Sequence, residues 1–372
     1  MYIVFLSASD KSGPTLARLS GAARAWRRSS RARGLAAMEQ RLEDHYERES
    51  KRHKGSGLGF DGAHSDAAQS VAVHYNSLAD RHRTLTSGSD ILHVRNLHNW
   101  IKSVLIGRHL RPGAAVLDLA CGKGGDMQKF RVGECATYCG VDIALQSVRD
   151  AVGRYNGCNG RPGMPFTGHF AAADFCDARL SRVLPPGVTY QASLSLPISR
   201  SPSLAPRLSP FFPTRDSVST RDAFPLHISQ LVSCQFAVHY AFATEARAEA
   251  MLANVASQLE PGGFFVGTTP DANVLVSRLR AAPELSFGNG RYQVAFNARH
   301  SSKRFDAAAP FGIGYRFSLN EAVDDCEEYL VHLPAFERLA RKHGLQLLFA
   351  SNFTDFFAQV RRHPSLRTSR LP

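Results

Sequence analysis

The stretch AVLDLACGKGGD, residues 115–126, decides the fold, because a short apolar run passes directly into a loop with three glycines. Residues 115–122 are typical of a buried strand, and the following GGDMQKF begins a helix. Glycines directly after a first strand let the backbone approach a ligand at the carboxyl edge of a sheet. The loop is not a phosphate-binding P-loop, since no Gly-Lys-Ser/Thr follows. It is not the dinucleotide motif GxGxxG either, since Ala120 occupies the first position.

Outward from this stretch, apolar strand-like runs alternate with helical patterns. We expect further strands at residues 136–144, 166–175, 231–240 and 264–270, with helices at 89–108, after 144, and at 248–259. Such alternation indicates an α/β protein with a doubly wound, mostly parallel sheet covered on both faces by helices.

Asp142 is the second feature that points to a nucleoside ligand. It ends the second strand, 20 residues after Gly122, where an acid accepts hydrogen bonds from a ribose. The alternative is a structural strand-to-helix turn with an incidental acid.

Composition narrows the classes of function. The chain carries 45 Lys+Arg against 32 Asp+Glu, a net charge of +13, which favours a polyanion such as RNA over a neutral partner. A merely basic protein would have the same balance. No run of 18 apolar residues exists, so we expect no membrane contact. The seven cysteines are scattered without a CxxC pair, so we expect a reducing compartment, no disulfide framework and no metal.

Three segments do not follow the α/β pattern of the rest of the chain. Residues 1–70 are expected to form a basic, disordered arm and linker, either an RNA-binding or nuclear-targeting segment or an organelle transit peptide. The ordered domain is expected at 71–360, and 361–372 form a basic tail. Residues 188–229 interrupt the domain as a Ser/Pro-rich insertion, which is either a disordered loop or translated intron.

The motifs now identify a family. LDLACGKGGD followed by GVDIA resembles the first two motifs of class I methyltransferases, which bind S-adenosylmethionine on a seven-stranded doubly wound sheet. NLHNWIKSVLI (96–106), VSCQFAVHYAF (232–242) and FFVGTTPDANVLVSRLR (264–280) resemble the mRNA cap guanine-N(7) methyltransferases in particular. The resemblance covers residues 71–175 and 230–357. It implies methyl transfer to capped RNA in the nucleus, with RNA polymerase II, other capping enzymes or an activating subunit as partners.

The resemblance also implies site residues. Those for S-adenosylmethionine are Lys102, Ala120, Gly122, Asp142, Asp174, Gln235 and Tyr240. Those for the cap are His98, Asn99, Lys123, Lys129, Arg154, His239, Glu328 and Phe357. His98 stands where the family has the first of two asparagines, and Phe357 where it has a tyrosine.

No side chain is expected to act as a general base, because guanine N(7) already holds a lone pair and the sulfonium methyl is activated. Two alternatives remain open at this point. One is a class I methyltransferase with a different substrate, since fold alone does not fix the acceptor. The other is a non-catalytic derivative that binds the cap or RNA.

Overall fold

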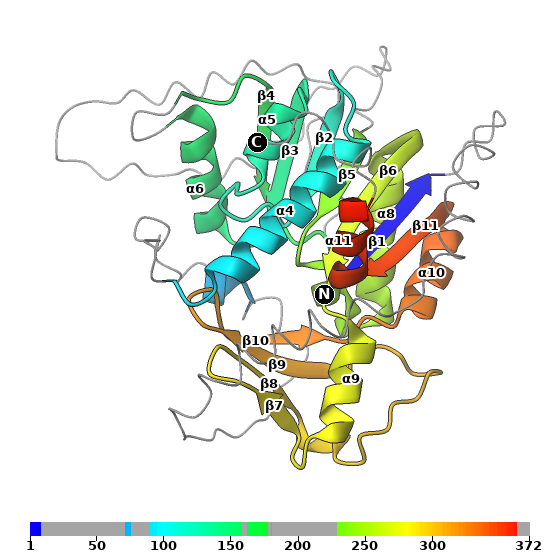
Figure 1. The fold of residues 1–372 in the computed structure, drawn as a ribbon. Helices are drawn as coiled ribbons and strands as arrows, with labels where there is room; N and C mark the ends of the chain where they lie inside the picture. Colours follow the sequence, from blue (N-terminus) through cyan, green and yellow to red (C-terminus); the bar gives the residue numbers. More distant parts are fainter. Residues whose placement is uncertain (9–70, 76–88, 158–161, 178–179, 181–228, 363–372) are drawn as a thin grey trace, which may run out of the picture.

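The computed structural model describes residues 1–8, 71–75, 89–157, 162–177, 180 and 229–362. Its centre is a seven-stranded sheet in the order β11-β1-β6-β5-β2-β3-β4, which confirms the expected α/β class (Figure 1). The strands are β1 (Tyr2–Ala8), β2 (Ala115–Leu119), β3 (Thr137–Asp142), β4 (Thr167–Ala172), β5 (Ser229–Cys234), β6 (Leu259–Thr269) and β11 (Leu345–Asn352). The pairs among β2 to β6 are parallel, and β1 is antiparallel to both of its neighbours.

Helices cover both faces of this sheet. One layer holds α4 (Leu92–His109), α5 (Met127–Val132), α6 (Leu145–Asn156) and α11 (Phe353–Arg362), and the other holds α8 (Glu245–Gln258) and α10 (Leu333–Lys342). Alternation along β2 explains the two cores, because Val116 packs with the first layer while Leu117 packs with the second. No helix in the described ranges is long and apolar enough to cross a membrane.

A second, antiparallel sheet adjoins the first and was not predicted. It contains β7 (Ser286–Gly288), β8 (Tyr292–Phe296), β9 (Gly314–Leu319) and β10 (Val323–Tyr329), and α9 (Ala272–Ala281) packs on it below the main sheet in Figure 1. β10 also contacts the 3-10 helix η3 (Val238–Ala243), which follows β5. The second sheet therefore brings its own side chains to the carboxyl edge of the main sheet. A shorter 3-10 helix, η4 (Ala298–His300), lies between β8 and β9.

The first residues correct the expectation of a disordered arm over 1–70. β1 lies between β6 and β11, and Ile3, Val4 and Leu6 are fully buried. The run YIVFLSA is apolar enough for a central strand, but its partners lie more than 250 residues away, so no local pattern marks the pairing. The rest of that arm, from residue 9 to residue 70, lies outside the described residues, as do 181–228 and 363–372.

Several further boundaries differ from expectation, among them those of β5 and of the insertion. The fourth strand was predicted over 231–240, but β5 ends at Cys234 and the chain turns at Phe236, whose φ is 59°. The insertion was predicted to include Ser229, but that residue belongs to β5. Gln230 is also part of this strand, where its amide donates to the His109 carbonyl at 2.9 Å and accepts from the Arg111 backbone at 3.3 Å.

Candidate functional site

A pocket opens at the carboxyl ends of the parallel strands. Its lining includes most of the residues predicted for the cofactor: Ala120, Gly122, Asp142, Asp174, Gln235 and Tyr240. Val71 and Tyr75, from before α4, line it as well and were not predicted. The motifs that are scattered along the sequence therefore meet at one edge of the sheet, as parallel topology requires.

The glycine-rich loop and Asp142 are fixed to each other. Ala120 and Gly122 have positive φ angles of 56° and 52°, which turn the backbone sharply after β2. The Gly122 N–H then donates to Asp142 Oδ2 at 2.8 Å, and the Ala144 N–H donates to Oδ1 at 2.9 Å. Burial raises the pKa of the Asp142 carboxyl. A carboxylate has about four lone-pair sites, so two remain to accept ribose hydroxyls.

Asp174, two residues after the end of β4, has a different environment. Its Oδ1 accepts from the Cys176 N–H at 2.8 Å, and its Oδ2 is paired with the Arg247 guanidinium at 2.9 Å. Both groups hold the carboxylate in place at the pocket wall. Arg247 also lines the pocket and was missed by sequence reasoning.

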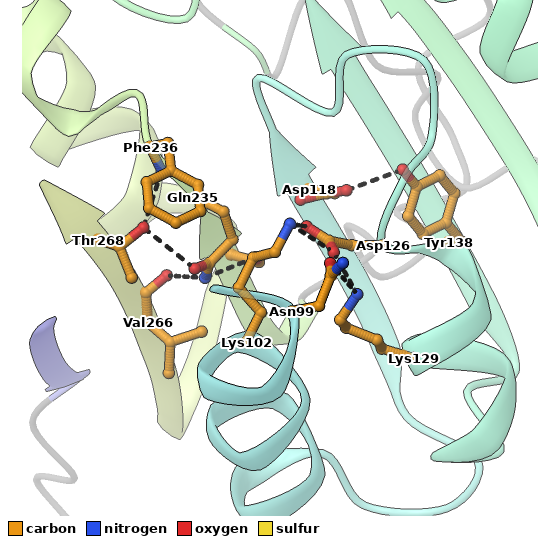
Figure 2. Close-up of polar contacts among 11 residues, drawn as sticks. Asn99, Lys102, Asp118, Asp126, Lys129, Tyr138, Gln235, Phe236, Val266 and Thr268 are labelled. Carbon is orange, nitrogen blue, oxygen red and sulfur yellow. Dashed lines mark hydrogen bonds and ion pairs between the residues drawn. The ribbon is translucent and has the colours of Figure 1, made fainter. Parts of the chain in front are cut away.

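A buried acid, Asp126, joins two predicted lysines from different elements (Figure 2). Lys102 of α4 lies 2.8 Å from Asp126 Oδ1, and Lys129 of α5 lies 2.7 Å from the same oxygen. Lys129 also donates to the Asn99 amide oxygen at 3.4 Å. Burial alone would raise the pKa of Asp126, but the two ammonium groups together lower it. Lys102 is therefore connected to the glycine-rich loop through Asp126 and is not itself part of the pocket lining.

Asp118 lies inside β2 beneath the loop and was also missed. Tyr138 Oη donates to its Oδ2 at 2.9 Å, as Figure 2 shows. Burial, with a smaller contribution from the charge of Asp126, raises the pKa of Asp118 to about 7. Its sequence context, LDLACG, contained the signal, but an acid in an apolar run can equally be a satisfied core residue.

A second polar group lies next to Tyr240. His239 of η3 and Glu328 of β10, both predicted for the cap, are buried with their Nε2 and Oε1 atoms 3.4 Å apart. This distance is within ion-pair reach, but neither ring nitrogen of His239 makes a hydrogen bond within the described part of the chain. Tyr315 Oη donates to Glu328 Oε2 at 2.7 Å. A buried, incompletely partnered imidazole beside a carboxylate is the arrangement expected of a site for a polar ligand.

Tyr240 connects the two parts of the site. Its ring centroid is 4.2 Å from that of His239, while its hydroxyl lies 3.2 Å from the Tyr75 hydroxyl. Because Tyr240 also lines the first pocket, a ligand there would meet the His239 and Glu328 side through this residue.

The other residues predicted for the cap, His98, Lys123, Arg154 and Phe357, differ in their surroundings. His98 packs against Phe236 at 4.8 Å, and burial, followed by nearby positive charges, lowers its pKa to about 4, so the ring is neutral. Lys123 pairs with Asp150 at 3.0 Å, and Arg154 lies in the last turn of α6. Phe357 packs on Trp100 at 5.0 Å and is not among the residues that line the pocket at the sheet edge.

Phe353, at the start of α11, contacts two residues of this region. Its ring lies edge-on to His98 with centroids 5.5 Å apart, and 6.1 Å from Phe236. Both phenylalanines occur in the segment FTDFF, where one helical turn separates them. Spacing alone could not show which of the two contacts Phe236, which lines the pocket.

Comparison with known proteins agrees with this geometry. A family model described as the mRNA (guanine-N(7))-methyltransferase domain matches residues 61–370. The mRNA cap guanine-N(7) methyltransferase 1 of Oryza sativa subsp. japonica is 38% identical over 322 residues, covering 84% of this chain and 76% of that protein. The corresponding protein of Arabidopsis thaliana is 36% identical over 301 residues, covering 80% and 70%. The mRNA cap guanine-N(7) methyltransferase of Saccharomyces cerevisiae is 32% identical over 297 residues, covering 78% and 59%. This chain therefore belongs to the mRNA (guanine-N(7))-methyltransferase family.

Proposed function

We propose that the chain transfers a methyl group from S-adenosylmethionine to guanine N(7) of the 5′ cap of mRNA. The observation that carries the proposal is the direct connection, through Tyr240, between the pocket at the sheet edge and the buried pair His239 and Glu328. The pocket has the features of a nucleoside site, and the pair of His239 and Glu328 has the features of a base-recognition site.

On the donor side, the residues present fit a nucleoside. Asp142 is held by two backbone N–H groups and keeps free lone pairs for the ribose hydroxyls, which is the chemistry of this position in nucleotide-binding sheets. The glycine-rich loop brings backbone close to the ligand without side-chain obstruction, since nothing lies within 4 Å of where a Cβ on Gly122 would stand. When bound, S-adenosylmethionine supplies an activated methyl on a sulfonium.

On the acceptor side, Glu328 fits guanine. A carboxylate can accept from the ring N1–H and the exocyclic amine of guanine, a donor pair that adenine does not present. Tyr315 fixes one carboxylate oxygen, which leaves the other directed toward His239. No base is needed at N(7), so the contribution of the protein is alignment, which can supply about 7–11 kcal/mol of barrier lowering.

The capped RNA partner and the location follow from the proposed substrate. Lys123, Lys129 and Arg154 provide the basic side chains for the cap phosphates, and an excess of 13 positive charges supports RNA binding. Nuclear location belongs to this proposal, as do RNA polymerase II, other capping enzymes or an activating subunit as partners.

The test is methyl transfer from labelled S-adenosylmethionine to three otherwise identical RNAs, with GpppG, ApppG or uncapped 5′ ends. We expect labelled product with GpppG RNA alone, and digestion with nuclease, pyrophosphatase and phosphatase should release labelled 7-methylguanosine. Label in uncapped RNA would indicate a different acceptor. Cofactor binding without label in any RNA would indicate a non-catalytic, RNA-binding derivative.

A further inference from the structure

The loop that follows β5 has an unfavourable backbone conformation at one residue. Phe236 has a φ of 59°, in the left-handed region that residues other than glycine rarely adopt. Such a conformation persists only when surrounding contacts determine it, and it clusters at ligand sites. The question is which contact holds Phe236.

Thr268, in the neighbouring strand β6, makes that contact (Figure 2). Its Oγ1 accepts from the Phe236 N–H at 2.8 Å and lies 3.3 Å from the Gln235 Oε1, to which it donates. One hydroxyl can serve both bonds, because it has one proton and two lone pairs. Thr268 is fully buried, so water does not substitute for either bond.

The bond from Thr268 also helps to orient the Gln235 side chain. Its Nε2 donates to Ser233 Oγ at 3.2 Å and to the Val266 carbonyl at 3.3 Å, while Thr268 binds its Oε1. The amide is therefore held at both ends. The Val266 carbonyl can only accept, so it requires the amide nitrogen on its side, and Oε1 is then the end that accepts the Thr268 proton.

The loop after β5 forms part of the cofactor pocket. Gln235 and Phe236 both line it, whereas Thr268 does not. The Phe236 ring lies against His98 at 4.8 Å and beneath the Lys102 ammonium at 5.6 Å. A change at Thr268 would therefore reach the pocket through two lining residues and through the α4 side chains that rest on Phe236.

We propose that Thr268 is a positioning residue for the methyl donor, acting by holding Phe236 in its left-handed conformation and Gln235 in one orientation. The proposal deepens the proposed function and rests on it for the identity of the donor. The adjacent Thr269 offers a matched comparison. It is also buried, in the same strand, but its Oγ1 has no hydrogen-bond partner among the residues that the structure describes.

The experiment compares Thr268→Val, Thr268→Ser and Thr269→Val in the full chain. Valine keeps the shape of threonine and removes the hydroxyl, whereas serine keeps the hydroxyl. We expect Thr268→Val to weaken calorimetric binding of S-adenosylmethionine about tenfold and to raise its KM similarly, because a buried N–H loses its acceptor. Thr268→Ser should stay within about threefold of the wild type, and Thr269→Val should bind normally.

Thermal unfolding of the same variants separates positioning from a purely structural role. A structural role would lower the Tm of Thr268→Val and leave the affinity of the remaining folded protein unchanged, which would overturn the proposal. Equal losses of affinity in Thr268→Val and Thr269→Val would overturn it too. If Thr268→Val does not fold, Thr268→Ala against Thr269→Ala answers the same question.

Binding is measured without RNA, so the result does not depend on the acceptor. A wild-type protein that binds S-adenosylmethionine but leaves GpppG RNA unmethylated would refute the proposed function and still permit the test of Thr268. Normal methylation with an unaffected Thr268→Val would refute only the role of Thr268.

Discussion

Glu328 is buried on β10 with a different neighbour at each carboxylate oxygen. Tyr315 Oη donates to Oε2 at 2.7 Å, and His239 lies 3.4 Å from Oε1. Sequence motifs identified Glu328 and His239 through the family resemblance, but they gave no indication of Tyr315. Tyr315 pairs across the strands β9 and β10 with Glu328 itself, a register that only the folded second sheet defines.

We expect Glu328→Gln and Tyr315→Phe to affect the acceptor and not the donor. Glutamine replaces one acceptor oxygen with a donor, so kcat/KM for GpppG RNA should fall about 10- to 100-fold, the worth of a hydrogen bond to a charged group. Phenylalanine leaves the carboxylate charged but unsupported, so a smaller loss of about tenfold is expected, mainly in the KM for RNA.

Calorimetry with S-adenosylmethionine is the control for both variants, and its affinity should stay within about twofold. Turnover of Glu328→Gln within about threefold of the wild type would show that Glu328 does not read the guanine. A loss of donor affinity in Tyr315→Phe would instead place Tyr315 in support of the cofactor pocket.

At the scale of elements, the main strands and helices could be predicted but their ends could not. Apolar runs and glycines located β2, β3 and β6, because burial and turns leave local patterns. β5 ends earlier than its apolar run, since the contact of Thr268 with Phe236 turns the backbone where the side chains alone would continue a strand. The second sheet was missed because its strands are short and half-exposed, and their pairing is specified mainly by contacts between strands.

The place of β1 in the sheet can be tested by substitutions within the strand. Leu6 is fully buried between helices and sheet, whereas Ser7 is half-buried and its hydroxyl donates to the neighbouring Ala8 carbonyl at 3.3 Å. Leu6→Ala should lower the free energy of unfolding by about 2–5 kcal/mol, the usual cost of a cavity in a core. Ser7→Ala, one residue further along the same strand, should change it by less than about 0.5 kcal/mol.

Chemical denaturation of both variants measures this difference. A value for Leu6→Ala close to that of the wild type would mean that residues 2–8 are not part of the sheet. The prediction from the sequence that residues 1–70 form an arm would then hold for these residues as well.

At the scale of the molecule, topology explains why the site could be largely predicted. Parallel strands send every carboxyl end to one edge, so Ala120, Asp142 and Gln235 meet although 115 residues separate the first from the last. What could not be predicted is the side-chain support that joins separate elements. Asp126 links α4 to α5, and β10 of the second sheet brings Glu328 to η3. Such contacts depend on how the elements pack against one another, and this packing leaves no fixed spacing in the sequence.

The extent of the insertion between β4 and β5 can be tested by deletion. Sequence composition placed it at 188–229, but the structure assigns Ser229 to β5, and Gln230 bonds to both His109 and Arg111. A deletion of residues 188–228 should therefore retain the fold and bind S-adenosylmethionine within about threefold of the wild type. Shortening a connection changes its closure free energy by only about 0.6 kcal/mol per halving.

A second deletion, of residues 188–230, is the matched control, because it differs only by Ser229 and Gln230. It leaves the His109 carbonyl and the Arg111 N–H without their partner, so its free energy of unfolding should be lower than that of the shorter deletion by about 1–3 kcal/mol. Equal stability of the two deletions would show that β5 does not begin at Ser229. Loss of cofactor binding in the shorter deletion would show that the inserted residues contribute to the site, against both the loop and the intron accounts. Sequenced mature transcripts then separate those two accounts, since an intron would be absent from them and a genuine loop present in all.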